Sequence, residues 1–99
     1  MTPKQIINQV SKITSIPYGR IACSIRIKGT GDARALAVWG ILHARPKTRQ
    51  TDIANLMSQS QGSISNAVKR ANARIETCPK FRAMRDQLQA VIEGQEVAA

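Results

Sequence analysis

Aromatic residues are scarce in this chain, and their scarcity narrows the classes of function open to it. Tyr18, Trp39 and Phe81 are the only three among 99 residues. They do not form the spaced pairs on which unpaired bases stack. The sequence therefore argues against single-strand and RNA-binding modules that are built on aromatic platforms.

Residues that bind metals or act as nucleophiles are also few. Cys23 and Cys78 stand far apart without CxxC spacing, and His43, the only histidine, lies near an expected helix end. This set supplies neither a metal-ligand cluster nor a nucleophile with a base and an orienting group. We therefore expect two reduced thiols, no metal, no cofactor and no enzymatic activity, with a helix-terminal or partly buried role for the histidine.

Long apolar runs are missing as well. No stretch approaches the roughly 18 apolar residues of a membrane span, and the start shows no secretory signal pattern. We expect a soluble cytoplasmic protein, associated with the bacterial nucleoid, that has no membrane partner and no small-molecule ligand.

Acidic residues number six, against fifteen Lys and Arg, so the formal net charge is +9. All the basic residues lie between Lys4 and Arg85, whereas Asp86, Glu93 and Glu96 fall in the last fourteen positions. The positive charge is thus concentrated on the expected folded body, as a polyanion binder requires. The length allows one domain with one modest core.

Helix start and stop patterns predict an all-α domain of five or six helices. Thr2-Pro3-Lys4-Gln5 is typical of a capped helix start, and Arg45-Pro46 and Gly94 are typical of helix ends. Between the first two long helices lies a basic loop, residues 24–31. We expect residues 1–94 to form the domain and residues 95–99 to fray.

Residues 48–72 have the pattern of a helix-turn-helix. Apolar residues at three- and four-residue spacing predict a first short helix, and Ser58-Gln59-Ser60 predicts the turn. Ser60 is expected to cap the second helix by accepting a hydrogen bond from a backbone N–H near Ser63. The second helix has one apolar stripe: Ile64, Ala67, Val68, Ala71 and Ile75.

Opposite that stripe the sequence places polar and basic side chains that are suited to reading base edges in a DNA groove. These are Gln61, Ser63, Ser65, Asn66, Lys69 and Arg70. The alternative is an ordinary amphipathic pair of helices with a solvated outer face. Such a face usually mixes Glu with Lys, yet no carboxylate occurs between Ser58 and Ala71. The composition favours DNA binding.

Gly62 is open to two interpretations at this stage. Its missing side chain can let the backbone approach DNA closely, or it can be a sterically required turn residue.

The order of elements over residues 2–93 resembles the C-terminal DNA-binding domain, domain IV, of the bacterial replication initiator DnaA, in the Trp-repressor-like group. The segments that carry the resemblance are IINQVSKITSIPYGRI, SIRIKGTGDARALAVWGIL, TRQTDIANLM and ISNAVKRANARIETCPKFRAMRDQL. The most diagnostic family motif, G-G-R-D-H-T-T-V, is replaced here by SQSQGSI. No GxxxxGK[ST] phosphate loop occurs.

The resemblance implies roles for particular residues. Arg26 and Lys28 match loop positions that enter the minor groove, Arg34 matches a phosphate-contacting arginine, and Asp32 replaces a second arginine. Lys69 and Arg70 match a basic pair late in the recognition helix. The D-H-T-T positions are occupied by Ser60, Gln61, Gly62 and Ser63, so the DNA sequence that is read is expected to differ from the family's.

Together these patterns predict a sequence-specific binder of double-stranded DNA that regulates transcription in a bacterium, phage or mobile element. RNA polymerase or a replication protein is a further expected partner. An origin-binding or replication-initiation role and a nonspecific structural nucleic-acid-binding role remain alternatives. The predicted major-groove residues are Ser60, Gln61, Gly62, Ser63, Ser65 and Asn66; the predicted minor-groove residues are Arg26 and Lys28; the predicted phosphate contacts are Arg34, Lys47, Arg49, Lys69 and Arg70.

Overall fold

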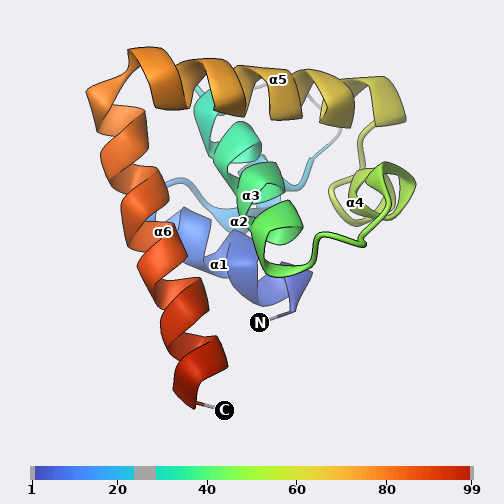
Figure 1. The fold of residues 1–99 in the computed structure, drawn as a ribbon. Helices are drawn as coiled ribbons and strands as arrows, with labels where there is room; N and C mark the ends of the chain where they lie inside the picture. Colours follow the sequence, from blue (N-terminus) through green and yellow to red (C-terminus); the bar gives the residue numbers. More distant parts are fainter. Residues whose placement is uncertain (1, 24–28, 99) are drawn as a thin grey trace.

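The computed structural model describes residues 2–23 and 29–98, the last four by their backbone only. This part of the chain is all-helical and contains six helices (Figure 1). Their bounds are α1 Pro3–Thr14, α2 Tyr18–Ile21, α3 Gly31–Ala44, α4 Gln50–Leu56, α5 Gln61–Thr77 and α6 Pro79–Ala98. No helix among these residues is long and apolar enough to cross a membrane.

The predicted capping box at the start of α1 is confirmed. The Thr2 hydroxyl accepts a hydrogen bond from the Gln5 backbone N–H at 3.2 Å, and the Gln5 side chain accepts one from the Thr2 N–H at 2.9 Å. Two of the backbone donors that a helix start leaves free are therefore satisfied locally. The helix ends at Ser15, whose φ of 60° is left-handed.

Helix α3 forms the centre of the molecule, with α1, α5 and α6 packed around it (Figure 1). Its buried residues occur on every side of the helix: Ala33, Ala35, Leu36, Ala37, Val38, Gly40 and Ile41. A Cβ at Gly40 would lie 2.6 Å from Leu88 Cδ2 and 2.9 Å from Ile6 Cγ2. Glycine here allows α1 and α6 to approach α3 closely.

Helices α5 and α6 meet at Cys78 and enclose α3 from two sides (Figure 1). Phe81, Leu88 and Ile92 of α6 are fully buried. Helix α6 continues past Gly94 to Ala98, which differs from the helix end predicted at that glycine. Glycine in a helix interior costs only about 1 kcal/mol relative to alanine, and the neighbouring Glu93 and Gln95 are good helix formers.

His43 lies in the last turn of α3, as its sequence position indicates. Its ring stacks on Trp39 with the centroids 4.8 Å apart, and its Nε2 lies 3.6 Å from Glu93 Oε1 of α6. The Arg85 guanidinium lies 5.7 Å from the centre of the Trp39 ring. The histidine therefore contributes to the contact between α3 and α6 while the residue as a whole is exposed, and of the two roles expected for it the helix-terminal one is confirmed.

Candidate nucleic-acid interface

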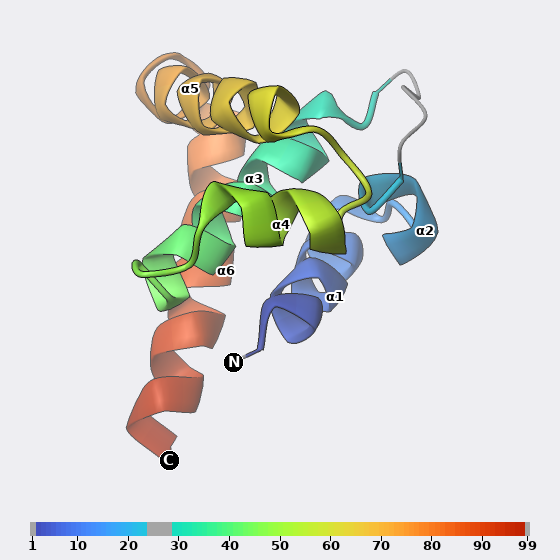
Figure 2. The ribbon, with the colours of Figure 1, turned by 90° about the vertical axis from the view of Figure 1, so that its right-hand side faces the viewer.

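The two helices predicted within residues 48–72 are present as α4 and α5, joined by residues 57–60 (Figure 2). We call this unit the α4–α5 hairpin. Ile53, Ala54 and Met57 are buried beneath it, as is Ile64 at the start of α5. The turn begins at Ser58, which has a left-handed φ of 55°. The apolar spacing in the sequence therefore predicted the local structure correctly.

Ser60 caps α5 in the predicted way. Its hydroxyl oxygen accepts a hydrogen bond from the Ser63 backbone N–H at 3.2 Å, and the two serine hydroxyls lie 3.0 Å apart. The cap defines where α5 begins, and it holds both hydroxyls at the first turn of the helix.

Five residues within the first ten of α5 are exposed, and we call them the front face of α5. They are Gln61, Gly62, Asn66, Lys69 and Arg70. No described residue forms a hydrogen bond or ion pair with the side chains of Gln61, Asn66 or Lys69. Since these three exposed side chains bond no described residue, their hydrogen-bonding groups are available to water or to a partner.

Ser65 differs from the other predicted groove residues because its side chain serves the hairpin. Its hydroxyl donates a hydrogen bond to Gln50 Oε1 of α4 at 2.7 Å, and the residue is half-buried. This bond joins the two helices. The structure thus groups Ser65 with the contact between α4 and α5 rather than with the front face.

Gly62 lies in open space within α5. A Cβ at this position would meet only Ser60 Oγ, at 3.9 Å, and the backbone is not left-handed. The surrounding atoms therefore do not require a glycine at this position, which argues against the interpretation of Gly62 as a sterically required turn residue. The position that needs a left-handed backbone is Ser58.

Arg26 and Lys28 fall on residues 24–28, which lie outside the described residues. The residue before this segment is held against the hairpin, because the Cys23 carbonyl accepts a hydrogen bond from Gln59 Nε2 at 3.1 Å. The residue after it, Gly29, has a left-handed φ of 88° and leads directly into buried Thr30 and α3. The described residues on either side of residues 24–28 therefore lie at the turn of the hairpin and at the start of α3 (Figure 2).

Arg34 was expected to contact phosphate, and the structure gives its guanidinium a role within the fold. Its Nε donates to the Ile21 carbonyl at 3.1 Å, and its Nη2 donates to the carbonyls of Arg20 and Cys23 at 3.2 and 3.1 Å. These carbonyls lie at the end of α2, where a helix leaves backbone acceptors unpaired. Arg34 thus holds the chain that leads into the basic segment.

Arg70 was likewise predicted as a phosphate contact, and it forms an ion pair in the structure. Its Nε lies 3.0 Å from Asp32 Oδ1, while Nη2 of Arg74 lies 2.9 Å from Asp32 Oδ2. Reasoning from the sequence missed both this cluster and Arg74. The signal in the sequence that could have indicated this cluster is Asp32 itself, the first acidic residue of a basic chain, placed at an expected helix start.

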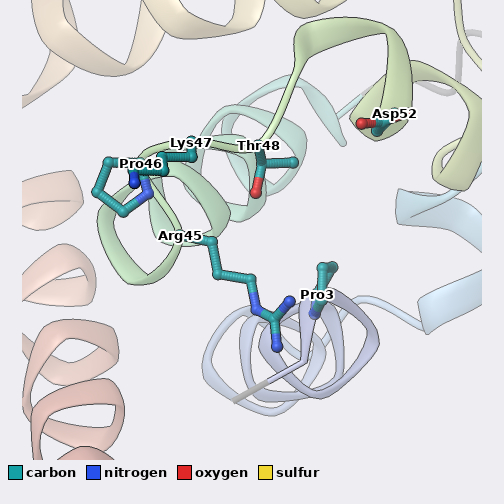
Figure 3. A pocket seen from close by; sticks show the side chains of 6 residues that line it. All are labelled: Pro3, Arg45, Pro46, Lys47, Thr48 and Asp52. Carbon is teal, nitrogen blue, oxygen red and sulfur yellow. The ribbon is translucent and has the colours of Figure 1, made fainter.

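Lys47 and Arg49 are exposed in the connection between α3 and α4. Lys47 borders an open hollow of about 560 Å³ beside the start of α1 (Figure 3). Its lining residues are Pro3, Arg45, Pro46, Lys47, Thr48 and Asp52, none of which belongs to α5. The structure therefore places Lys47 at a hollow that α5 does not line.

Comparison of the chain with protein-family models, with curated proteins and with solved structures finds no match in any of the three. The resemblance to the DnaA domain therefore rests on the quoted segments alone and stays a prediction. The local geometry of α4, the turn and α5 stands independently of it. Among the described residues, no group of three His, Cys, Asp or Glu side chains is placed to bind a metal ion.

Proposed function

We propose that this domain binds double-stranded DNA in a sequence-specific manner and regulates transcription in a bacterium, phage or mobile element. The front face of α5 would lie in the major groove, with residues 24–28 in the adjacent minor groove. The observation that carries the proposal is the exposed, unpartnered state of Gln61, Asn66 and Lys69 on a helix surface that has no carboxylate from Ser58 to Ala71.

The chemistry of these side chains matches base readout. An Asn or Gln amide can donate to and accept from the N6 and N7 edge of adenine at the same time, and Lys can reach guanine or phosphate. Helix α5 contributes no carboxylate between Ser58 and Ala71 that would repel the phosphate backbone, and the Asp32 carboxylate of α3 is ion-paired with Arg70. Salt-dependent contacts from Lys69, Arg70 and Arg49 would supply most of the affinity, and the amides would supply the specificity.

The length of the front face suits a groove. Gln61 and Arg70 are nine residues apart, which places them about 14 Å apart along the helix axis at 1.5 Å per residue. The major groove is about 12 Å wide. The front face is therefore about as long as the groove is wide.

The experiment is a selection of bound sequences from a library of random duplexes, followed by titration of the enriched duplex in fluorescence anisotropy. We expect the enriched duplex to resist competition by a scrambled duplex of the same composition. We also expect affinity to fall steeply with salt, with about −0.9 in the slope of log K against log salt for each phosphate contacted. A salt-independent titration would overturn the proposal, and equal competition by the scrambled duplex would reduce it to nonspecific binding.

A further inference from the structure

A single carboxylate holds two arginines of α5. Asp32 lies in the first turn of α3, which packs beneath α5 (Figure 1). One of its oxygens accepts from Arg70 Nε at 3.0 Å and the other accepts from Arg74 Nη2 at 2.9 Å. Two arginines and one carboxylate leave this group of three residues with a net positive charge. Each arginine donates only one hydrogen bond to the carboxylate, so most of their N–H donors are not used by it.

Arg70 keeps hydrogen-bond donors that Asp32 does not bind. Its side chain is 55% exposed, and no described residue accepts a hydrogen bond from its two terminal nitrogens. Those nitrogens form the edge of the guanidinium that can bind a phosphate with two parallel hydrogen bonds. The Arg74 side chain is less exposed than that of Arg70, and its Nε is buried without a hydrogen-bond partner among the described residues.

Gly31 completes the arrangement. A Cβ on this residue would lie 2.9 Å from Arg70 Cζ and 3.0 Å from its Nη1, so the flat guanidinium rests directly against the backbone at the start of α3. Backbone on one side and Asp32 at its Nε fix the plane of the group. A long, flexible side chain is thereby ordered before any ligand arrives.

We infer that Asp32 is a positioning residue for DNA binding: it orients Arg70 so that the free edge of its guanidinium meets a backbone phosphate. The inference rests on the proposed function. An acid on a polyanion-binding face would by charge alone weaken binding. Ordering Arg70 before DNA binds should instead strengthen binding. Immobilising such a side chain on association otherwise costs about 0.5–1.5 kcal/mol of binding free energy.

The inference therefore predicts a result that runs against simple electrostatics. Asp32→Ala raises the net charge by one, yet it should weaken binding to the enriched duplex by about three- to tenfold. Asp32→Asn keeps an oxygen acceptor for Arg70 and should lose less. The matched controls are Asp52→Ala and Asp52→Asn, which remove the same charge from an exposed residue of α4 whose carboxylate has no partner among the described residues. They should bind as tightly as the original protein or more tightly.

A double-mutant cycle separates positioning from a merely structural role. Arg70→Ala should weaken binding in the original protein and lower the salt slope by about 0.9. In the Asp32→Ala background the same change should have a much smaller effect, because the arginine is no longer aligned. Thermal unfolding of each variant checks that the domain stays folded, and if Asp32→Ala does not fold, Asp32→Asn against Asp52→Asn carries the comparison.

The outcomes distinguish the inference from the proposal on which it rests. If the original protein shows no salt-dependent binding to duplex DNA, the proposed function itself fails. If it binds DNA and both Asp32 variants bind as tightly or more tightly, the Asp32 carboxylate only repels phosphate or neutralises the charge of the arginines, and the inference is overturned. Additive effects of Asp32→Ala and Arg70→Ala would also overturn it.

Discussion

Helices α3 and α5 pack against each other, yet they differ in how much of their sequence is buried. Seven of the fourteen residues of α3 are buried, and they occur on all its sides. Only Ile64 and Ala71 of the seventeen residues of α5 are fully buried. Burial of apolar area is the main stabilising term of a small domain, so α3 accounts for much of the stability of the fold. Helix α5 instead keeps an outer surface on which the side chains of Gln61, Asn66 and Lys69 bond no described residue.

This contrast separates the residues that hold the fold together from those available to a partner. Changes in α3 should act on unfolding, and changes at Gln61, Gly62, Asn66 or Lys69 of α5 should act on binding while leaving unfolding nearly unchanged. Residues at the junction of the two helices, such as Asp32 and Arg70, should affect both.

The largest effect is expected at Gly40 in α3. Gly40→Ala should lower the free energy of unfolding by about 1–3 kcal/mol, because Ile6 and Leu88 are fully buried and must move to admit the methyl group. For a domain of this size, each kcal/mol shifts Tm by about 4–8 °C. Gly19→Ala is the control, since a Cβ there meets nothing within 4 Å. An unchanged Tm for Gly40→Ala would show that α3 is not packed as described.

At the front face of α5 we expect some substitutions to reduce sequence specificity and others to reduce affinity for any duplex. Asn66→Ala should cost about 1–3 kcal/mol on the enriched duplex and little on a scrambled one, because the amide would read a base edge. Lys69→Ala should weaken binding to both duplexes alike, since a phosphate contact carries no sequence information. Parallel anisotropy titrations measure both. Equal losses for Asn66→Ala on the two duplexes would remove the base-reading role.

The turn between α4 and α5 offers a smaller test of the hairpin. Ser58 has a φ of 55°, which costs a residue with a side chain roughly 1–2 kcal/mol. Ser58→Gly relieves this strain, but glycine also raises the conformational entropy of the unfolded chain, which offsets part of the gain. The free energy of unfolding should therefore rise by up to about 1 kcal/mol. Ser58→Val, with a β-branched side chain, should be less stable than the original protein. If denaturant midpoints rank the valine variant above the glycine variant, the left-handed turn is wrong.

Features that depend on neighbours in the chain could be predicted from the sequence. The hydroxyls of Thr2 and Ser60 cap helices that start within three residues of them, and the apolar spacing of α4 and α5 located both helices. The end of α6 was placed too early, because the weak preference of Gly94 against helix was overridden by its flanking residues.

Contacts between distant residues could not be predicted in this way. Asp32 and Arg74 are 42 positions apart, and Ser65 and Gln50 are 15 apart. No local periodicity specifies which side chains face each other after the helices pack. No sequence pattern therefore indicated that the Ser65 hydroxyl bonds Gln50 of α4, or that the Arg34 guanidinium bonds carbonyls near α2.

Gly62 gives the smallest expected change in stability and tests the function of the front face most directly. It is exposed, it has a helical backbone, and a Cβ would meet only Ser60 Oγ at 3.9 Å. Gly62→Ala should therefore leave the free energy of unfolding unchanged or raise it by less than about 1 kcal/mol, since alanine is the better helix former. In the proposed complex, however, the backbone at this residue approaches the duplex, so the added methyl group should weaken binding. The prediction is a variant that unfolds no more easily than the original protein and binds the enriched duplex less tightly. Full affinity in Gly62→Ala would mean that the start of α5 does not approach DNA closely at this residue, and the docking of the front face would have to be revised.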